Sequence, residues 1–154
     1  MMLGMFILMS GCSKVDKPKA ETLVLKVDDS KIYLDEMLYH VMLAEMQGEL
    51  YASVVGDDEN YWDIKNDDGS TMGEATKKMA LDNAIKYELL YNIAIKDGYT
   101  LTEEEKELSK SKVDNIIGNV QEEQVQKTEL TNDRLLKIQE KIAVATRYYD
   151  NYIK

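Results

Sequence analysis

The chain has 154 residues, close to the usual size of one folded domain, of which 44% are hydrophobic and 31% charged. This composition excludes an intrinsically disordered chain. The net charge of −10, without any cluster of Lys and Arg, argues against a nucleic-acid partner, because phosphate binding needs basic residues gathered on one face. Glycine and proline are scarce, with eight and one, and this favours long helices.

The stretch around Cys12, the only cysteine, is similar to a bacterial lipoprotein signal. An apolar run over residues 1–9 and two small residues precede Cys12, and a polar stretch with the only proline follows it. The resemblance implies a signal peptide over 1–11, lipidation of Cys12, a tether over 12–22 and an extracytoplasmic protein anchored to the bacterial cell membrane. No basic residue precedes the run, and Met9 stands where the pattern prefers Leu. The alternative is a buried N-terminal strand with a free thiol.

A short β-hairpin is predicted next, with strands over 23–27 and 31–34 and a turn between them. A two-stranded hairpin is marginal alone, so it must rest on another element. Asp35 is the expected N-cap of a first helix that runs to about residue 53. The residues on or flanking one face of this helix are Met37, Leu38, Val41, Met42, Glu45 and Met46.

A loop is predicted over 54–69, and a long second helix follows it. Thr71 and Glu74 have the spacing of a capping box, and Gly98 marks the C-terminal end after Lys96. Apolar residues cover most of the surface of this helix, so we expect it to be the central helix, in contact with neighbours on several sides.

Two further helices complete the predicted fold. Thr102 and Glu105 form a second capping box at the start of the third, while Leu130 and Leu135 have hydrophobic-staple spacing around Thr131 at the start of the fourth. The polar stretch over 121–128 is either exposed helix or a fraying helix end. The sequence therefore predicts one mainly α domain over 23–154, with a short hairpin and about four helices. The fourth helix reaches Lys154 without a stop signal, so the gene is short or the chain is part of a longer protein.

Residues with catalytic or metal-binding potential are few. His40 is the only histidine and is expected to be a helix-surface or half-buried structural residue. It cannot form a structural zinc site with Cys12, because such sites need four ligands. The acidic loop does not fit an EF-hand, since Ile64 and Ala75 would occupy positions that should be acidic. We therefore expect an acidic loop exposed to solvent and not a calcium site. No catalytic residue, metal or cofactor is predicted.

The expected binding site for a polypeptide is the cleft between the first helix and the loop, near Met42, Met46, Tyr61 and Trp62. Methionine adapts its shape to varied apolar partners, although the simpler interpretation, which we favour, is that these methionines fill the core. The Tyr61–Trp62 pair could either pack back on the helices as a lid or contact an unfolded client.

The order of these elements resembles the N-terminal chaperone domain of the SurA/PrsA family of extracytoplasmic foldases. The resemblance rests on residues 24–36, where a strand and a turn lead into Lys-Ile-Tyr-Leu-Asp-Glu, and on residues 94–105, which read Ala-Ile-Lys-Asp-Gly-Tyr-Thr-Leu-Thr-Glu-Glu-Glu. It covers about residues 24–154 and implies binding of unfolded or secreted polypeptides. Members of the PrsA type are lipoproteins, which agrees with Cys12.

The isomerase activity of that family belongs to a parvulin domain that this chain has no room for. The resemblance therefore implies the chaperone portion and not the prolyl isomerase. Two alternatives remain open, a fragment of a prolyl isomerase and a structural lipoprotein with one fixed partner.

Overall fold

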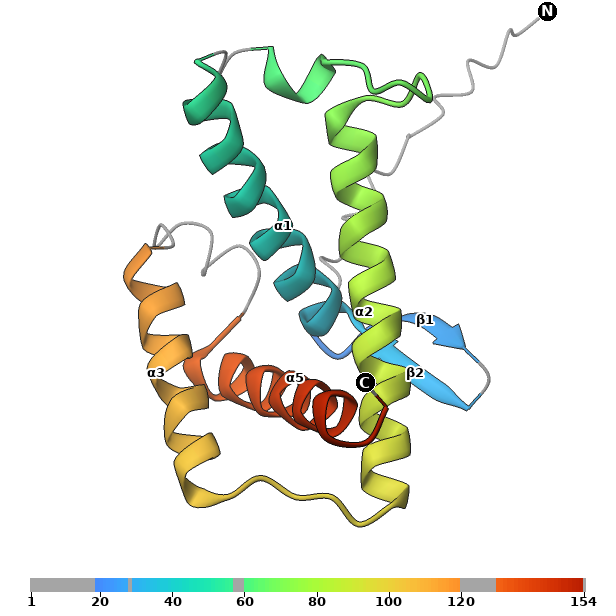
Figure 1. Cartoon of the computed structure of the whole chain (residues 1–154), viewed down its shortest axis with the longest axis vertical. Helices are drawn as coiled ribbons and strands as arrows, with labels where there is room; N and C mark the ends of the chain where they lie inside the picture. The colour runs from blue at the N-terminus through green and yellow to red at the C-terminus, as the bar shows by residue number, and fades with distance from the viewer. Residues whose placement is uncertain (1–18, 28, 57–59, 120–129, 154) are drawn as a thin grey trace, which may run out of the picture.

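The computed structural model describes residues 19–27, 29–56, 60–119 and 130–153. Within these ranges the chain is mainly helical, with an antiparallel hairpin followed by four long helices, which confirms the predicted fold class. Figure 1 shows the helices α1 (Leu34–Val55) and α2 (Met72–Lys96) extending to the top of the molecule, while α3 (Glu103–Asn119) and α5 (Asn132–Tyr152) lie in its lower half. The signal peptide, Cys12 and most of the predicted tether lie outside the described residues.

The hairpin consists of β1 (Leu23–Val27) and β2 (Ser30–Tyr33). Along β2, buried Ser30 and Ile32 alternate with exposed residues, so one face of the strand lies against α2 and α1. The chain is already part of the fold before β1, because Ala20 is buried and its carbonyl accepts a hydrogen bond from the Asp35 backbone N–H. Residues 19–22, which the sequence assigns to the tether, thus belong to the folded domain.

The first helix, α1, spans Leu34–Val55 and is slightly longer than predicted. The expected N-cap role of Asp35 is wrong, because Tyr33 is the extended capping residue and Asp35 lies inside the first turn. There the Asp35 carboxylate accepts a hydrogen bond from the Glu36 N–H and pairs with Arg134 of α5 at 2.9 Å. Gly56 ends α1 in the left-handed conformation at φ 77°.

The second helix, α2, spans Met72–Lys96 and is the central helix, as predicted, since it contacts α1, α5, β2 and the short 3₁₀ helix η1 (Tyr61–Asp63). Its predicted capping box is present. The Glu74 N–H donates to Thr71 Oγ1 at 3.1 Å and the Thr71 N–H donates to Glu74 Oε2 at 2.8 Å. However, the buried residues of α2 are mostly small, and several of its large apolar side chains are exposed: Met79, Leu81, Ile93 and Ile95.

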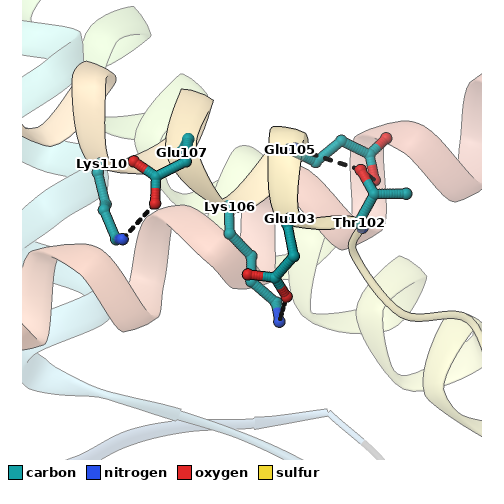
Figure 2. A network of polar contacts seen from close by, with 6 residues as sticks. All are labelled: Thr102, Glu103, Glu105, Lys106, Glu107 and Lys110. Carbon is teal, nitrogen blue, oxygen red and sulfur yellow. Dashed lines mark hydrogen bonds and ion pairs between the residues drawn. The ribbon is translucent and has the colours of Figure 1, made fainter.

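The remaining helices are α3 (Glu103–Asn119) and α5 (Asn132–Tyr152). Figure 2 shows the start of α3, where the predicted box between Thr102 and Glu105 is formed. At the start of α5, Thr131 accepts a hydrogen bond from the Arg134 N–H. The staple residues on either side of Thr131 are both fully buried. The main core joins α1, α3 and α5 through Tyr39, Met42, Val113, Leu130, Leu135 and Ile138.

Candidate binding surface

The ring of Trp62 packs against α1 at Gly48. A Cβ added to Gly48 would lie 2.3 Å from Trp62 Cη2, so the close approach depends on the missing side chain. The neighbouring Tyr61 is buried, and its ring meets Trp62 edge-on at 5.2 Å. The pair therefore packs back on the helices, and Trp62 lines a cavity of about 420 Å³ between α1, η1 and α2.

This cavity matches the cleft expected between the first helix and the loop, but its lining differs from the expectation. Of the four expected residues, Trp62 lines the cavity, together with residues such as Val41 and Ala80. Met42 is instead buried in the core with α3 and α5, and Met46 packs against the same cluster. The structure thus brings Tyr61 and Trp62 together and separates them from the two methionines, which fill the core.

A larger groove of about 600 Å³ lies where all four long helices meet. Its apolar lining comes from each of them, with Leu43 on α1, Tyr87 on α2, Ile116 on α3 and Ile142 on α5. Polar groups also line it, and the Tyr39 hydroxyl donates to Gln139 Oε1 at 2.7 Å across the α1–α5 contact. Apolar walls with a few placed polar groups are typical of ligand-binding pockets.

The face of α1 that lines this groove continues beyond it as an exposed apolar surface. Leu43, Gln47, Leu50 and Val54 follow at helical spacing on one side of α1. Leu50 is 64% exposed and Val54 is 77% exposed. Tyr51 and Val55, which also lie in the last two turns of α1, are exposed as well. We call Leu50, Tyr51, Val54 and Val55 the α1 tip. In Figure 1 it lies at the top of the molecule, beyond α3 and α5. The sequence signal for it was an apolar run that continues to the end of the helix.

His40 is more deeply buried than the half-buried residue expected from sequence, with only 3% of its surface exposed. Its ring stacks on Tyr87 of α2 with centroids 5.8 Å apart and planes within 9°. Burial, assisted by the nearby Lys141 ammonium, lowers the pKa of His40 to about 4, so its imidazole is neutral at pH 7. A neutral, stacked histidine agrees with the structural role expected for it.

A buried ionic cluster joins three helices and was not found from sequence. Lys141 of α5 pairs with Glu36 of α1, at 2.8 Å between Nζ and Oε2, and with Glu88 of α2. Asn92 donates hydrogen bonds of 2.8 Å to both Glu88 and Ser30, which extends the cluster to β2. The available signal was Lys141 itself, a charged residue three positions after buried Ile138 on the core-facing side of α5.

The acidic loop is organised by local hydrogen bonds. The Asp68 carboxylate accepts from the Ser70 N–H at 2.9 Å and from the Ser70 hydroxyl at 2.6 Å, and these bonds lower the pKa of Asp68. Among the described residues, no three His, Cys, Asp or Glu side chains are placed to hold a metal ion. Asp57, Asp58 and Glu59 lie outside the described ranges.

Comparisons with known proteins do not assign the chain to a family. No protein-family model, curated protein or solved structure matches the chain. Within the described ranges, no helix is both long and apolar enough to cross a bilayer.

Proposed function

We propose that the chain is a membrane-anchored, extracytoplasmic chaperone module that binds apolar segments of unfolded or secreted polypeptides without catalysing a reaction. The observation that supports this most directly is the α1 tip, because it continues the lining of the four-helix groove onto the surface. Contiguous apolar side chains at a protein surface commonly mark interaction sites. The anchoring part of the proposal rests on the sequence around Cys12.

The free energy gained by burying the side chains of the α1 tip fits weak and adaptable binding. Fully burying one Leu or Val side chain contributes roughly 1.5–3 kcal/mol, while association costs at least about 4 kcal/mol in lost freedom. Contacts at the tip alone would therefore be transient. A segment that also enters the groove would gain contacts with Leu43, Ile116 and Ile142. An amphipathic helix in an apolar groove is a common mode of peptide recognition.

The test is aggregation of an unfolded model client, followed by light scattering, with and without the purified chain. We expect the chain to slow aggregation, and the double variant Leu50→Gln with Val54→Gln to lose most of this effect. Both positions are strongly exposed, so the variant should keep its fold. Circular dichroism and thermal unfolding would check this.

The matched control is Leu81→Gln with Ile93→Gln, which removes two exposed apolar side chains of α2 that line none of the described cavities. It should retain the wild-type effect. Equal loss in both double variants would mean that general surface hydrophobicity, and not the tip, is responsible. An inactive wild-type chain that binds no unfolded peptide would overturn the proposed function. A single stoichiometric partner recovered from membranes would instead indicate a structural lipoprotein.

A further inference from the structure

The cavity between α1, η1 and α2 combines an aromatic residue with apolar and charged ones. Val41, Ala44 and Ala80 contribute apolar side chains to its lining, and Trp62 contributes an indole. The ring of Trp62 is seated against Gly48, and the residue remains half-buried. The volume of about 420 Å³ falls within the usual range of small-ligand pockets, roughly 300–1,000 Å³. The cavity can therefore hold one long side chain of a binding partner.

The charged residues of this cavity are two glutamates of α1 and one lysine of α2. Glu45 and Glu49 both line it and are four residues apart, so their Cβ atoms lie about 5–6 Å apart on one side of the helix. Like charges at this spacing repel each other. Within the described part of the chain, neither carboxylate has an ion-pair partner, and Lys77, which lines the same cavity, pairs with neither of them. The lining thus carries two negative charges and one positive charge, with no cation bound between the glutamates.

Carboxylates beside an indole are a favourable environment for a cation. An ammonium or guanidinium group near a tryptophan ring is attracted by the ring, and this attraction adds to that of the carboxylates. A guanidinium can also stack on an aromatic ring and bind a carboxylate through two parallel hydrogen bonds. The net charge of −10 favours cationic partners over acidic ones. Charge complementarity therefore points to a basic side chain with an apolar stem, which is the chemistry of arginine and lysine.

We propose that this cavity binds an arginine or lysine side chain of the client polypeptide. The cationic head lies between Trp62 and the carboxylates of Glu45 and Glu49, and the stem lies along the apolar part of the lining. This inference rests on the proposed function and makes it more specific, because clients are then recognised by basic residues as well as by apolar ones.

The experiment uses two short apolar peptides that differ in one charge. Neither contains an aromatic residue, and the central residue is arginine in one and citrulline, its neutral counterpart, in the other. Trp62 is the only tryptophan of the chain and lines the cavity, so its fluorescence reports binding to the purified chain directly. We expect the arginine peptide to change this fluorescence saturably and to bind roughly tenfold more tightly than the citrulline peptide at low salt. The difference should shrink at high salt, because exposed charges are then screened.

Three variants locate the cation. Glu45→Gln with Glu49→Gln should abolish the preference for arginine, whereas Lys77→Gln should strengthen arginine binding, since it removes a repelling charge. The matched control is Glu104→Gln with Asp114→Asn, which removes two exposed carboxylates of α3 that line neither cavity described above. This control changes the net charge as much as the first double variant does and should keep the preference. All five positions are exposed, so the variants should keep their fold, which circular dichroism checks.

Equal binding of the two peptides, or a preference for arginine that survives in the Glu45 and Glu49 double variant, would overturn the proposal. Equal loss in the α3 control would also overturn it, because the attraction would then come from the net charge alone. The same holds if neither peptide changes the fluorescence of Trp62. In each case the proposed function stands if the wild-type chain still slows client aggregation. A wild-type chain that neither slows aggregation nor binds either peptide overturns both.

Discussion

Gly48 is the residue on which the position of Trp62 depends. A methyl group at position 48 would overlap the indole ring, which is held in place by η1. We predict that Gly48→Ala displaces Trp62 and destabilises the protein by about 1–3 kcal/mol, the usual cost of overpacking. Trp62 is the only tryptophan, so its fluorescence reports the displacement directly, and urea unfolding gives the free energy.

Gly118→Ala is the matched control for this change. Gly118 also lies inside a helix, α3, but a Cβ there would meet no atom within 4 Å. This substitution should leave the fluorescence unchanged and stabilise the protein by up to about 1 kcal/mol, because Ala favours the helix over Gly. Similar destabilisation in both variants would mean that the contact with Trp62 is not the cause.

Lys141 is the second residue with a large expected effect. Lys141→Met removes the one cation between Glu36 and Glu88, while its apolar stem is replaced by a side chain of similar shape. We predict a loss of about 3–5 kcal/mol at pH 7, since breaking a buried ion pair leaves charge without a partner. The loss should shrink at acid pH, because burial raises the pKa of Glu36 and this carboxyl group then binds a proton. Chemical denaturation at pH 7 and pH 4.5 measures both values.

Lys137→Met, one turn earlier on the exposed side of α5, is the corresponding control. It should change stability by less than about 0.5 kcal/mol, as surface substitutions usually do. If Lys141→Met were no more harmful than Lys137→Met, the cluster would not be an energetically important contact between the helices.

At the scale of whole elements, the helix starts depend on two capping boxes. In both, the threonine side chain accepts a backbone N–H and a glutamate three residues later accepts the threonine N–H. We predict that Thr71→Ala and Thr102→Ala each cost about 1 kcal/mol, measured as the free energy of unfolding. Thr100→Ala, which changes an exposed threonine before α3, should have almost no effect. Equal losses at all three positions would argue against the capping role.

The elements could be predicted from sequence where local chemistry determines them. The caps at Thr71, Thr102 and Thr131 depend on residues within a few positions, so their spacing was sufficient. Asp35 was misassigned as a cap because the hairpin brings Tyr33 and Leu34 directly into the helix, and Arg134 of a distant helix binds the Asp35 carboxylate.

The candidate binding surface was less predictable, because it is made by contacts between elements. Trp62 was identified, but nothing in the sequence showed that Gly48 receives its ring. Met42 and Met46 fill the core, as the simpler interpretation held, and do not join Tyr61 and Trp62. The periodicity of a helix does not say which neighbour each face meets. The Glu36–Glu88–Lys141 cluster likewise required the arrangement of α1, α2 and α5 in space.

At the scale of the whole molecule, the net charge of −10 makes repulsion between carboxylates the main long-range electrostatic term. Several of the favourable surface pairs join residues three or four positions apart on one helix. On α3, Lys106 contacts Glu103 at 2.6 Å, and Figure 2 shows this pair beside that of Lys110 with Glu107. Such exposed pairs contribute only about 0–1 kcal/mol each.

We therefore predict that the melting temperature rises when NaCl is increased from about 10 mM to about 150 mM, because the Debye length falls from about 30 Å to about 8 Å and long-range repulsion is screened. Sodium and potassium chloride should act alike at equal ionic strength. A lower melting temperature at higher salt would mean that the surface pairs outweigh the repulsion.

The helices α1 and α2 pack against each other, and many of their buried residues are small, with Ala44, Gly48 and Ala52 on α1 and Ala80 and Ala84 on α2. The two helices thereby turn bulky side chains such as Leu50, Val54 and Met79 outward. Tolerance to substitution should follow this arrangement. In a complete mutational scan for folding, these buried small residues should be the least replaceable positions of this pair, and the large apolar ones at the surface among the most replaceable. Any selection that preserves those exposed side chains must then act on what the protein binds and not on how it folds.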